Sequence, residues 1–135
     1  MAKFVATDYN ITIGGTDFST SLAAVTLDIS AEEQETTSFG DTFRERIGGL
    51  KDGSISLDFH QDFGASAIDA TLFPLLGTAL TIVIKPTSSA VGATNPTYTL
   101  SALCTEYQPF ASSVGDLATL SVTWPTSGPI TRATS

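Results

Sequence analysis

Residues 54–61 read Ser-Ile-Ser-Leu-Asp-Phe-His-Gln, and polar and apolar side chains alternate along the whole stretch. This period of two predicts a β-strand with Ile55, Leu57 and Phe59 facing a core. His60, the only histidine of the chain, falls on the outward, polar face. A half-buried strand is therefore the unit from which the fold is expected to be built.

The same alternation recurs on both sides of this stretch. Strands are predicted over residues 9–13, 22–29, 80–84, 97–107 and 117–124. Their apolar positions predict the inward faces, which comprise Ile11, Ile13, Val25, Leu27, Ile29, Leu80, Ile82, Ile84, Tyr98, Leu100, Ala102, Cys104, Leu120, Val122 and Trp124. Six or seven strands follow from this pattern.

One segment has the spacing of a helix instead. Its apolar side chains recur at i, i+4, i+7 and i+8, namely Ile68, Leu72, Leu75 and Leu76. Ser66 is the expected N-cap, with Asp69 three residues later, and Gly77 is the expected stop. The chain is thus predicted to form a single mainly β domain over residues 1–135, a β-sandwich or distorted barrel with one short α-helix. Residues 125–135 are expected to be a C-terminal tail.

Residues 30–53, SAEEQETTSFGDTFRERIGGLKDG, break the pattern. They lack clear alternation and contain four glycines, so we expect a long loop between strands, with at most a short helical stretch. Half of the six basic residues lie here among acidic ones. Large apolar and basic side chains gathered in one loop favour a contact between subunits, made by Phe39, Phe43, Arg44, Arg46, Ile47, Leu50 and Lys51.

The composition excludes several classes of protein. Charged residues make up 15% of the 135, against roughly 25% in typical proteins, and 14 acidic against six basic residues give a net charge of −8. No basic stripe for DNA, RNA or an anionic membrane can be assembled from so few cations. An apolar content of 41% argues against disorder. Hydroxyl side chains replace the missing charge, with 21 Thr and 15 Ser.

No constellation for catalysis or metal binding is evident. His60 has no G-x-S-x-G partner, Cys104 has no second cysteine, and Asp58, Asp62 and Asp69 match no calcium loop. We therefore expect a protein that is not an enzyme and has no cofactor. A carbohydrate-binding or hydrolytic β-module is an alternative with weak support, since only one Trp and three Tyr are available. The N-terminus lacks a secretory signal, so folding in a reducing cytoplasm is expected.

Several motifs together resemble a known group of proteins. Phe39 to Gly53 reads F-G-D-x-x-R-x-R-I-G-G-L-K-D-G, and it is accompanied by D-A-T-L-F-P-L-L-G, V-I-K-P-T-S, N-P-T-Y and a closing V-T-W-P-T-S-G-P-I-T. These resemble small virion proteins of tailed bacteriophages, chiefly of actinobacterial phages, which are related to the tail tube protein group. The likeness covers most of the chain.

The resemblance implies a β-sandwich with a flanking helix, a location in the virion and one of two functions. Tail tube subunits form stacked hexameric rings around a conduit for DNA, and a long loop reaches the adjacent ring; residues 30–53 occupy the corresponding place. The same fold also serves capsid decoration or minor capsid proteins that stabilise the head shell, which is the alternative. Either way the resemblance implies a homo-oligomer in the virion, assembled in the host bacterial cytoplasm, that contacts other virion proteins and no membrane.

Overall fold

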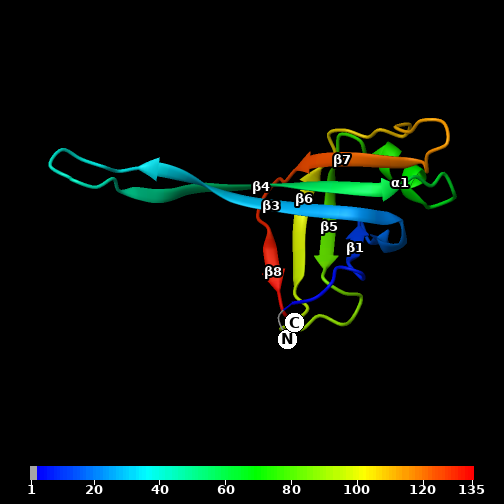
Figure 1. Ribbon diagram of the computed structural model, residues 1–135, viewed down its shortest axis with the longest axis horizontal. Coiled ribbons are helices and arrows are strands. Elements are labelled where there is room, and N and C mark those ends of the chain that lie inside the picture. Colours follow the sequence, from blue (N-terminus) through cyan, green and yellow to red (C-terminus); the bar gives the residue numbers. More distant parts are fainter. Residues whose placement is uncertain (1–2) are drawn as a thin grey trace.

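Two antiparallel β-sheets packed face to face make up the body in the computed structural model, which describes residues 3–135 (Figure 1). The five-stranded sheet has the order β2 (Thr16–Asp17), β1 (Asn10–Ile13), β5 (Ala79–Lys85), β6 (Thr97–Leu103) and β8 (Thr131–Ala133). The three-stranded sheet has the order β3 (Leu22–Glu35), β4 (Arg46–His60) and β7 (Thr119–Pro125). The predicted β-sandwich is confirmed, with eight strands and no closed barrel among the residues described.

The core lies between the sheets and follows the predicted alternation. Ile55, Leu57 and Phe59 of β4 are fully buried, and Leu57 is paired in register with Val122 of β7. Trp124 is also fully buried, and its ring N–H donates a 2.9 Å hydrogen bond to the Glu106 carbonyl. The indole thus fills the core while its single polar atom is satisfied, as buried tryptophans require. The prediction that Cys104 faces inward is confirmed as well.

Helix α1 (Ile68–Leu75) covers the end of the sandwich where β4 finishes (Figure 1). Ile68 and Leu72 are buried, as their spacing predicted, and Gly77 follows with a positive φ of 86°. The predicted N-cap was wrong, because Ala67 occupies the cap position and Ser66 has a φ of 59°. The carbonyl of Asp62 supplies the acceptor instead, taking a 3.2 Å hydrogen bond from the Asp69 N–H.

Residues 30–53 form strands rather than the predicted loop, and no helix is found there. Strand β3 continues to Glu35 and β4 begins at Arg46, so only residues 36–45 connect them. The tail prediction also needs correction, since β8 pairs with β6, placing Arg132 opposite Tyr98. In both segments the strand pairing comes from backbone hydrogen bonds, which need no alternation of apolar side chains.

A half-buried hydroxyl joins three segments at the helix end of the body. The Tyr107 hydroxyl donates a 2.7 Å hydrogen bond to Asp69 Oδ1 and accepts one of 3.2 Å from Gln61 Nε2. Gln61 Nε2 also donates to the Pro109 carbonyl at 2.9 Å. Burial raises the pKa of Tyr107 to about 12, and the Asp69 carboxylate acts in the same direction. This network fixes the long connection between β6 and β7 against α1.

The Tyr107→Phe variant is expected to lose about 1 kcal/mol of stability, because the partners of the hydroxyl lose a hydrogen bond. Its free energy of unfolding should also lose the pH dependence that the Tyr107 hydroxyl contributes. The folded-state pKa of about 12 exceeds the usual value of 10, so in the native sequence the free energy of unfolding is fullest below pH 10 and falls as pH rises toward 12. Urea denaturation at pH 8 and pH 11 measures both effects. An unchanged pH dependence in the variant would contradict the role given to Tyr107.

Candidate assembly interface

A two-stranded arm projects from the body (Figure 1), and we use this term for residues 29–53 of the β3–β4 hairpin. The third strand of the sheet stops at the root of the arm, where Ser54 pairs with Pro125 of β7. Every side chain from Asp28 to Asp52 is exposed. The arm is therefore a ribbon with two solvated faces, which is marginally stable on its own in water.

The pairing along the arm contains one irregularity. Ala31 pairs with Lys51, but the next pair is Glu33 with Gly48, so β4 carries one more residue than β3 between them. This arrangement is a β-bulge, which bends and twists a ribbon. A Cβ atom placed on Gly49 would lie 3.2 Å from Cβ of Glu32, so glycine suits the crowded side of the bulge.

The tip of the arm is ordered by its own hydrogen bonds. The Asp41 N–H donates to the Ser38 carbonyl at 3.1 Å, and the Ser38 N–H donates to Asp41 Oδ2 at 2.8 Å. Gly40 has a φ of 96°, the positive value that the third residue of a type II turn needs. Phe39 occupies the second position of this turn, so its ring points away from the ribbon and is fully exposed.

Two ion pairs cross the arm between its strands. Arg46 Nε lies 2.7 Å from Glu33 Oε1, and Arg44 Nη1 lies 3.4 Å from Glu35 Oε1. Both pairs are largely exposed to solvent, where such contacts contribute roughly 0–1 kcal/mol. They join the two strands near the tip and leave the guanidinium groups accessible to another molecule.

The root of the arm is closely packed against the chain that follows β7. The Gly53 carbonyl accepts hydrogen bonds from both the N–H and the hydroxyl of Thr126, at 3.0 and 3.1 Å. A Cβ atom on Gly53 would lie 2.8 Å from Cδ1 of Ile130 and 2.9 Å from the Asp28 carbonyl. Any larger residue at position 53 would thus displace the arm from its direction of exit.

All seven residues predicted to form a subunit contact lie on this arm. Phe39, Phe43 and Arg44 belong to the connection at the tip, and the others lie on β4. They do not share one face, since Arg46 and Ile47 alternate along the strand and point to opposite sides. Their four large apolar side chains are all exposed, at 60% or more. Both faces of the arm therefore present apolar side chains to solvent.

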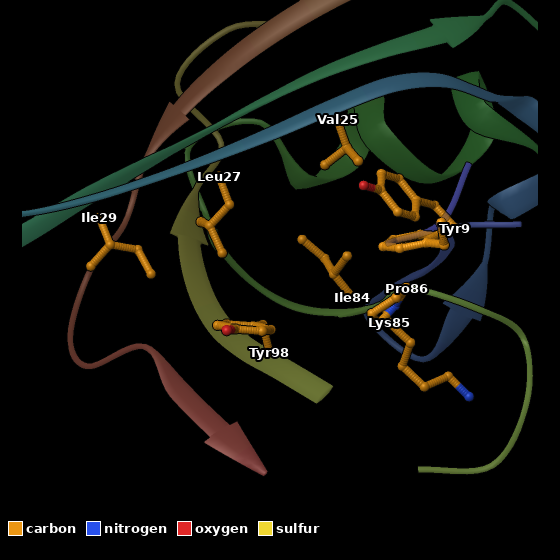
Figure 2. Close-up of a pocket in the computed structure, with 9 residues that line it drawn as sticks. Tyr9, Val25, Leu27, Ile29, Ile84, Lys85, Pro86 and Tyr98 are labelled. Atoms are coloured by element: carbon orange, nitrogen blue, oxygen red, sulfur yellow. The ribbon is translucent and has the colours of Figure 1, made fainter. Parts of the chain in front are cut away.

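An apolar groove opens beside the root of the arm, where the two sheets diverge (Figure 2). Its volume is about 340 Å³. One wall comes from the inner face of β3, the other from the five-stranded sheet and the N-terminal segment, and the lining residues are Phe4, Tyr9, Val25, Leu27, Ile29, Ile84, Lys85, Pro86 and Tyr98. Ile29, predicted to be inward, points into this open space and is 52% exposed.

The N-terminal wall of the groove is tied to the body by one carboxylate. Asp8 Oδ2 accepts hydrogen bonds from the N–H and the hydroxyl of Ser88, at 3.0 and 2.8 Å. These bonds hold the pKa of the Asp8 carboxyl below its usual value. Phe4 and Tyr9 on either side of Asp8 have their rings 6.2 Å apart, so they form one aromatic wall.

Sequence reasoning identified the arm but missed the groove. Tyr98 and Ile29 were placed on inward faces, yet no pattern in the sequence indicates that the sheets separate there. Phe4 and Tyr9 had no assigned role. The groove draws its residues from several distant segments, so only the folded chain brings them together.

The absence of catalytic and metal-binding sites stays a prediction for residues 3–135. Within that range, no three His, Cys, Asp or Glu side chains are placed to hold a metal ion. None of the helices described there is long and apolar enough to cross a membrane. His60 is exposed on the outer face of β4, where it pairs in register with Thr119.

The fold has counterparts among solved structures of particles. No protein-family model matches the chain, and no curated protein matches its sequence. A chain in the virion of the native gene transfer agent (GTA) particle superposes with a TM-score of 0.73 at 17% identity, covering 93% of this chain and 95% of that one. A chain from the tail of the empty GTA particle, refined as a helix with C6 symmetry, gives 0.67 at 17% identity, with 87% and 86% covered. At this level of identity the likeness establishes the shared fold.

Proposed function

We propose that this protein is a non-enzymatic structural subunit of a phage-like virion tail. Its copies form stacked hexameric rings around a conduit for DNA, and the arm links one ring to the next. The observation that carries the proposal is the arm itself, a solvated two-stranded ribbon with four large exposed apolar side chains. Such a ribbon has no evident use in a solitary monomer, because exposed apolar surface of this kind marks an interaction site.

The likeness to the GTA chains supports this choice of assembly. The match spans nearly the whole of both chains, and one of the matched chains is described in a tail with C6 symmetry. A hexamer with C6 symmetry is a closed ring with a head-to-tail interface between neighbours. An arm that leaves the body in one direction suits contact between successive rings.

The charge of the body suits the passage of DNA. The outer face of the three-stranded sheet carries Asp28, Asp58 and the single histidine, His60, among Ser and Thr side chains. Neither β4 from Gly53 onward nor β7 contains Lys or Arg. Phosphates are repelled by such a face rather than held. We propose that this face lines the conduit, so DNA moves along it without specific binding.

A capsid accessory role is the second candidate. One of the matched chains is described only as part of a virion, which includes both head and tail. In that role the arm would clamp shell subunits of the head. Gold labelling of virions with antibody against this chain decides between the two: we expect label along the tail, and label confined to the head would overturn the tail assignment.

Replacing both tip arginines, as Arg44→Ala with Arg46→Ala, is expected to impair assembly and leave the fold intact. The ion pairs of the arm are exposed, so their loss costs the monomer less than about 1 kcal/mol, whereas an interface that buries the guanidinium groups loses charge-assisted hydrogen bonds. The concentration needed for assembly should rise at least about tenfold, which corresponds to about 1.4 kcal/mol. Sedimentation velocity measures this shift. Unfolding of the double variant would show that the arginines act within the monomer instead.

A further inference from the structure

The tip of the arm exposes two phenylalanines that the monomer does not cover. Phe39 is fully exposed and Phe43 is 85% exposed. Both lie in the short connection between the strands, far from the sandwich (Figure 1). Because the arm points away from the body, the tip cannot fold back onto the groove of its own chain. Burial of these rings therefore requires a second molecule.

The groove at the root of the arm offers a surface of matching chemistry. Its walls are aliphatic on the side of β3 and aromatic on the sides of Tyr9 and Tyr98 (Figure 2). Its volume of about 340 Å³ lies near the lower end of the range for small binding pockets. It is open to solvent, so side chains of another molecule can reach its walls. Aromatic rings packed edge to face would gain more than their buried area alone.

The charges of the two surfaces are complementary. Residues 30–53 contain six acidic and three basic residues, so the arm is net negative. The chain has three basic residues outside that segment, and Lys85 is the one that lines the groove. Lys3 precedes Phe4 of the groove wall in the sequence, and Arg132 of β8 pairs in register with Tyr98. A lysine at the edge of an apolar groove favours an acidic, aromatic partner over a neutral one.

We propose that the groove is the acceptor for the arm tip of a second copy of this chain, with Phe39 and Phe43 inserted between β3 and the Tyr9–Tyr98 side. The inference rests on the proposed function, because it names the partner surface of the same arm. Donor and acceptor lie on different parts of one chain, so the contact is heterologous and each copy can both give and receive an arm. Such a contact extends an assembly instead of stopping at a dimer.

A complementation experiment tests this assignment. The donor-defective variant is Phe39→Ala with Phe43→Ala, and the acceptor-defective variant is Tyr9→Glu with Ile29→Glu, where both replaced side chains are exposed in the groove. Each variant alone is expected to form only the smallest particle that assembles without the contact between arm tip and groove. An equimolar mixture should form particles of twice that mass, because the intact arms of one variant fit the intact grooves of the other. Sedimentation velocity and mass photometry read out the doubling.

The matched control replaces two other exposed phenylalanines, at the far end of the body. Phe63 and Phe110 stack with ring centroids 5.6 Å apart, 56% and 85% exposed. The Phe63→Ala, Phe110→Ala variant is expected to assemble like the native protein. A further control confirms that each variant keeps the native circular dichroism spectrum and melting temperature within a few degrees.

Several outcomes overturn the assignment. If the mixture shows no species larger than either variant alone while both are folded, the arm does not enter this groove. If the acceptor variant assembles normally and native mass spectrometry finds a small apolar molecule on the native protein, the groove is a ligand pocket. If the native protein forms tubes but the mixed variants do not assemble, the tail proposal stands and the assignment of the groove as acceptor is wrong. If the mixed variants double in mass but the antibody labels only virion heads, the groove assignment stands and the tail proposal is wrong.

Discussion

Replacing residues 32–50 with an Asn-Gly turn is expected to give a folded protein that no longer stacks. Ala31 and Lys51 face each other directly in the β3–β4 register, so a two-residue type I′ turn joins them without disturbing the pairs below. The deleted segment contains no buried side chain, so the core is unchanged. The melting temperature should stay within a few degrees of the native value, while all assembly through the arm is lost. Differential scanning calorimetry and electron microscopy measure the two effects.

A matched variant separates length from chemistry in this deletion. It keeps the arm at full length but replaces Phe39, Phe43, Ile47 and Leu50 with threonine, which favours strands. Both variants are expected to fail in the same way. Stacked particles from the shortened chain would contradict the account, because they would show that assembly uses the body alone.

Trp124→Ala is expected to produce the largest loss of stability among single substitutions in the body. The indole is fully buried between the sheets, and its removal leaves a cavity and an unpaired Glu106 carbonyl. Losses of about 3–5 kcal/mol are typical for such truncations, against a total of about 5–15 kcal/mol for a domain. Guanidinium denaturation followed by far-ultraviolet circular dichroism measures the change. Since the core holds the root of the arm, assembly should weaken in parallel.

The Trp124→Phe variant provides the comparison. It retains most of the apolar volume but loses the donor to the Glu106 carbonyl, so its cost should be well below that of the alanine variant. If Trp124→Ala stayed within about 0.5 kcal/mol of the native protein, a value typical of surface positions, the central place of this side chain in the core would be wrong.

The body of the fold was predictable because one side of each strand is buried. Ile55, Leu57 and Phe59 alternate with polar residues for this reason, and so do Leu120, Val122 and Trp124. A strand with one buried face and one solvent-exposed face has apolar and polar residues that alternate along its sequence. The short helix was visible on the same grounds, through the spacing of Ile68 and Leu72.

The arm was wrongly predicted to be a loop because both of its faces are exposed to solvent. Nothing between Asp28 and Asp52 is buried, so no alternation is selected, and the glycines that serve the bulge and the turn look like loop residues. The strand pairing rests on the backbone, which every sequence carries. Ser66 was misplaced as a cap for a related reason, since the acceptor for the helix start is the backbone carbonyl of Asp62.

The residues that we predict to form a subunit contact could be chosen from the sequence, whereas the groove could not. Phe39, Phe43 and the tip arginines stand out within one short segment, where unusual composition is visible in the sequence. The groove combines Tyr9, Ile29 and Tyr98 from three separate strands or their flanks. Its existence depends on where β3 departs from the five-stranded sheet, and that divergence is a property of the packed sheets alone.

The most direct measurement is cryo-electron microscopy of the purified native protein at concentrations where it assembles. We expect stacked rings with six-fold symmetry, in which the β3–β4 arm of each subunit crosses to the neighbouring ring and its tip is buried there. Particles that remain monomeric at every concentration, or rings whose arms project freely into solvent, would contradict the account.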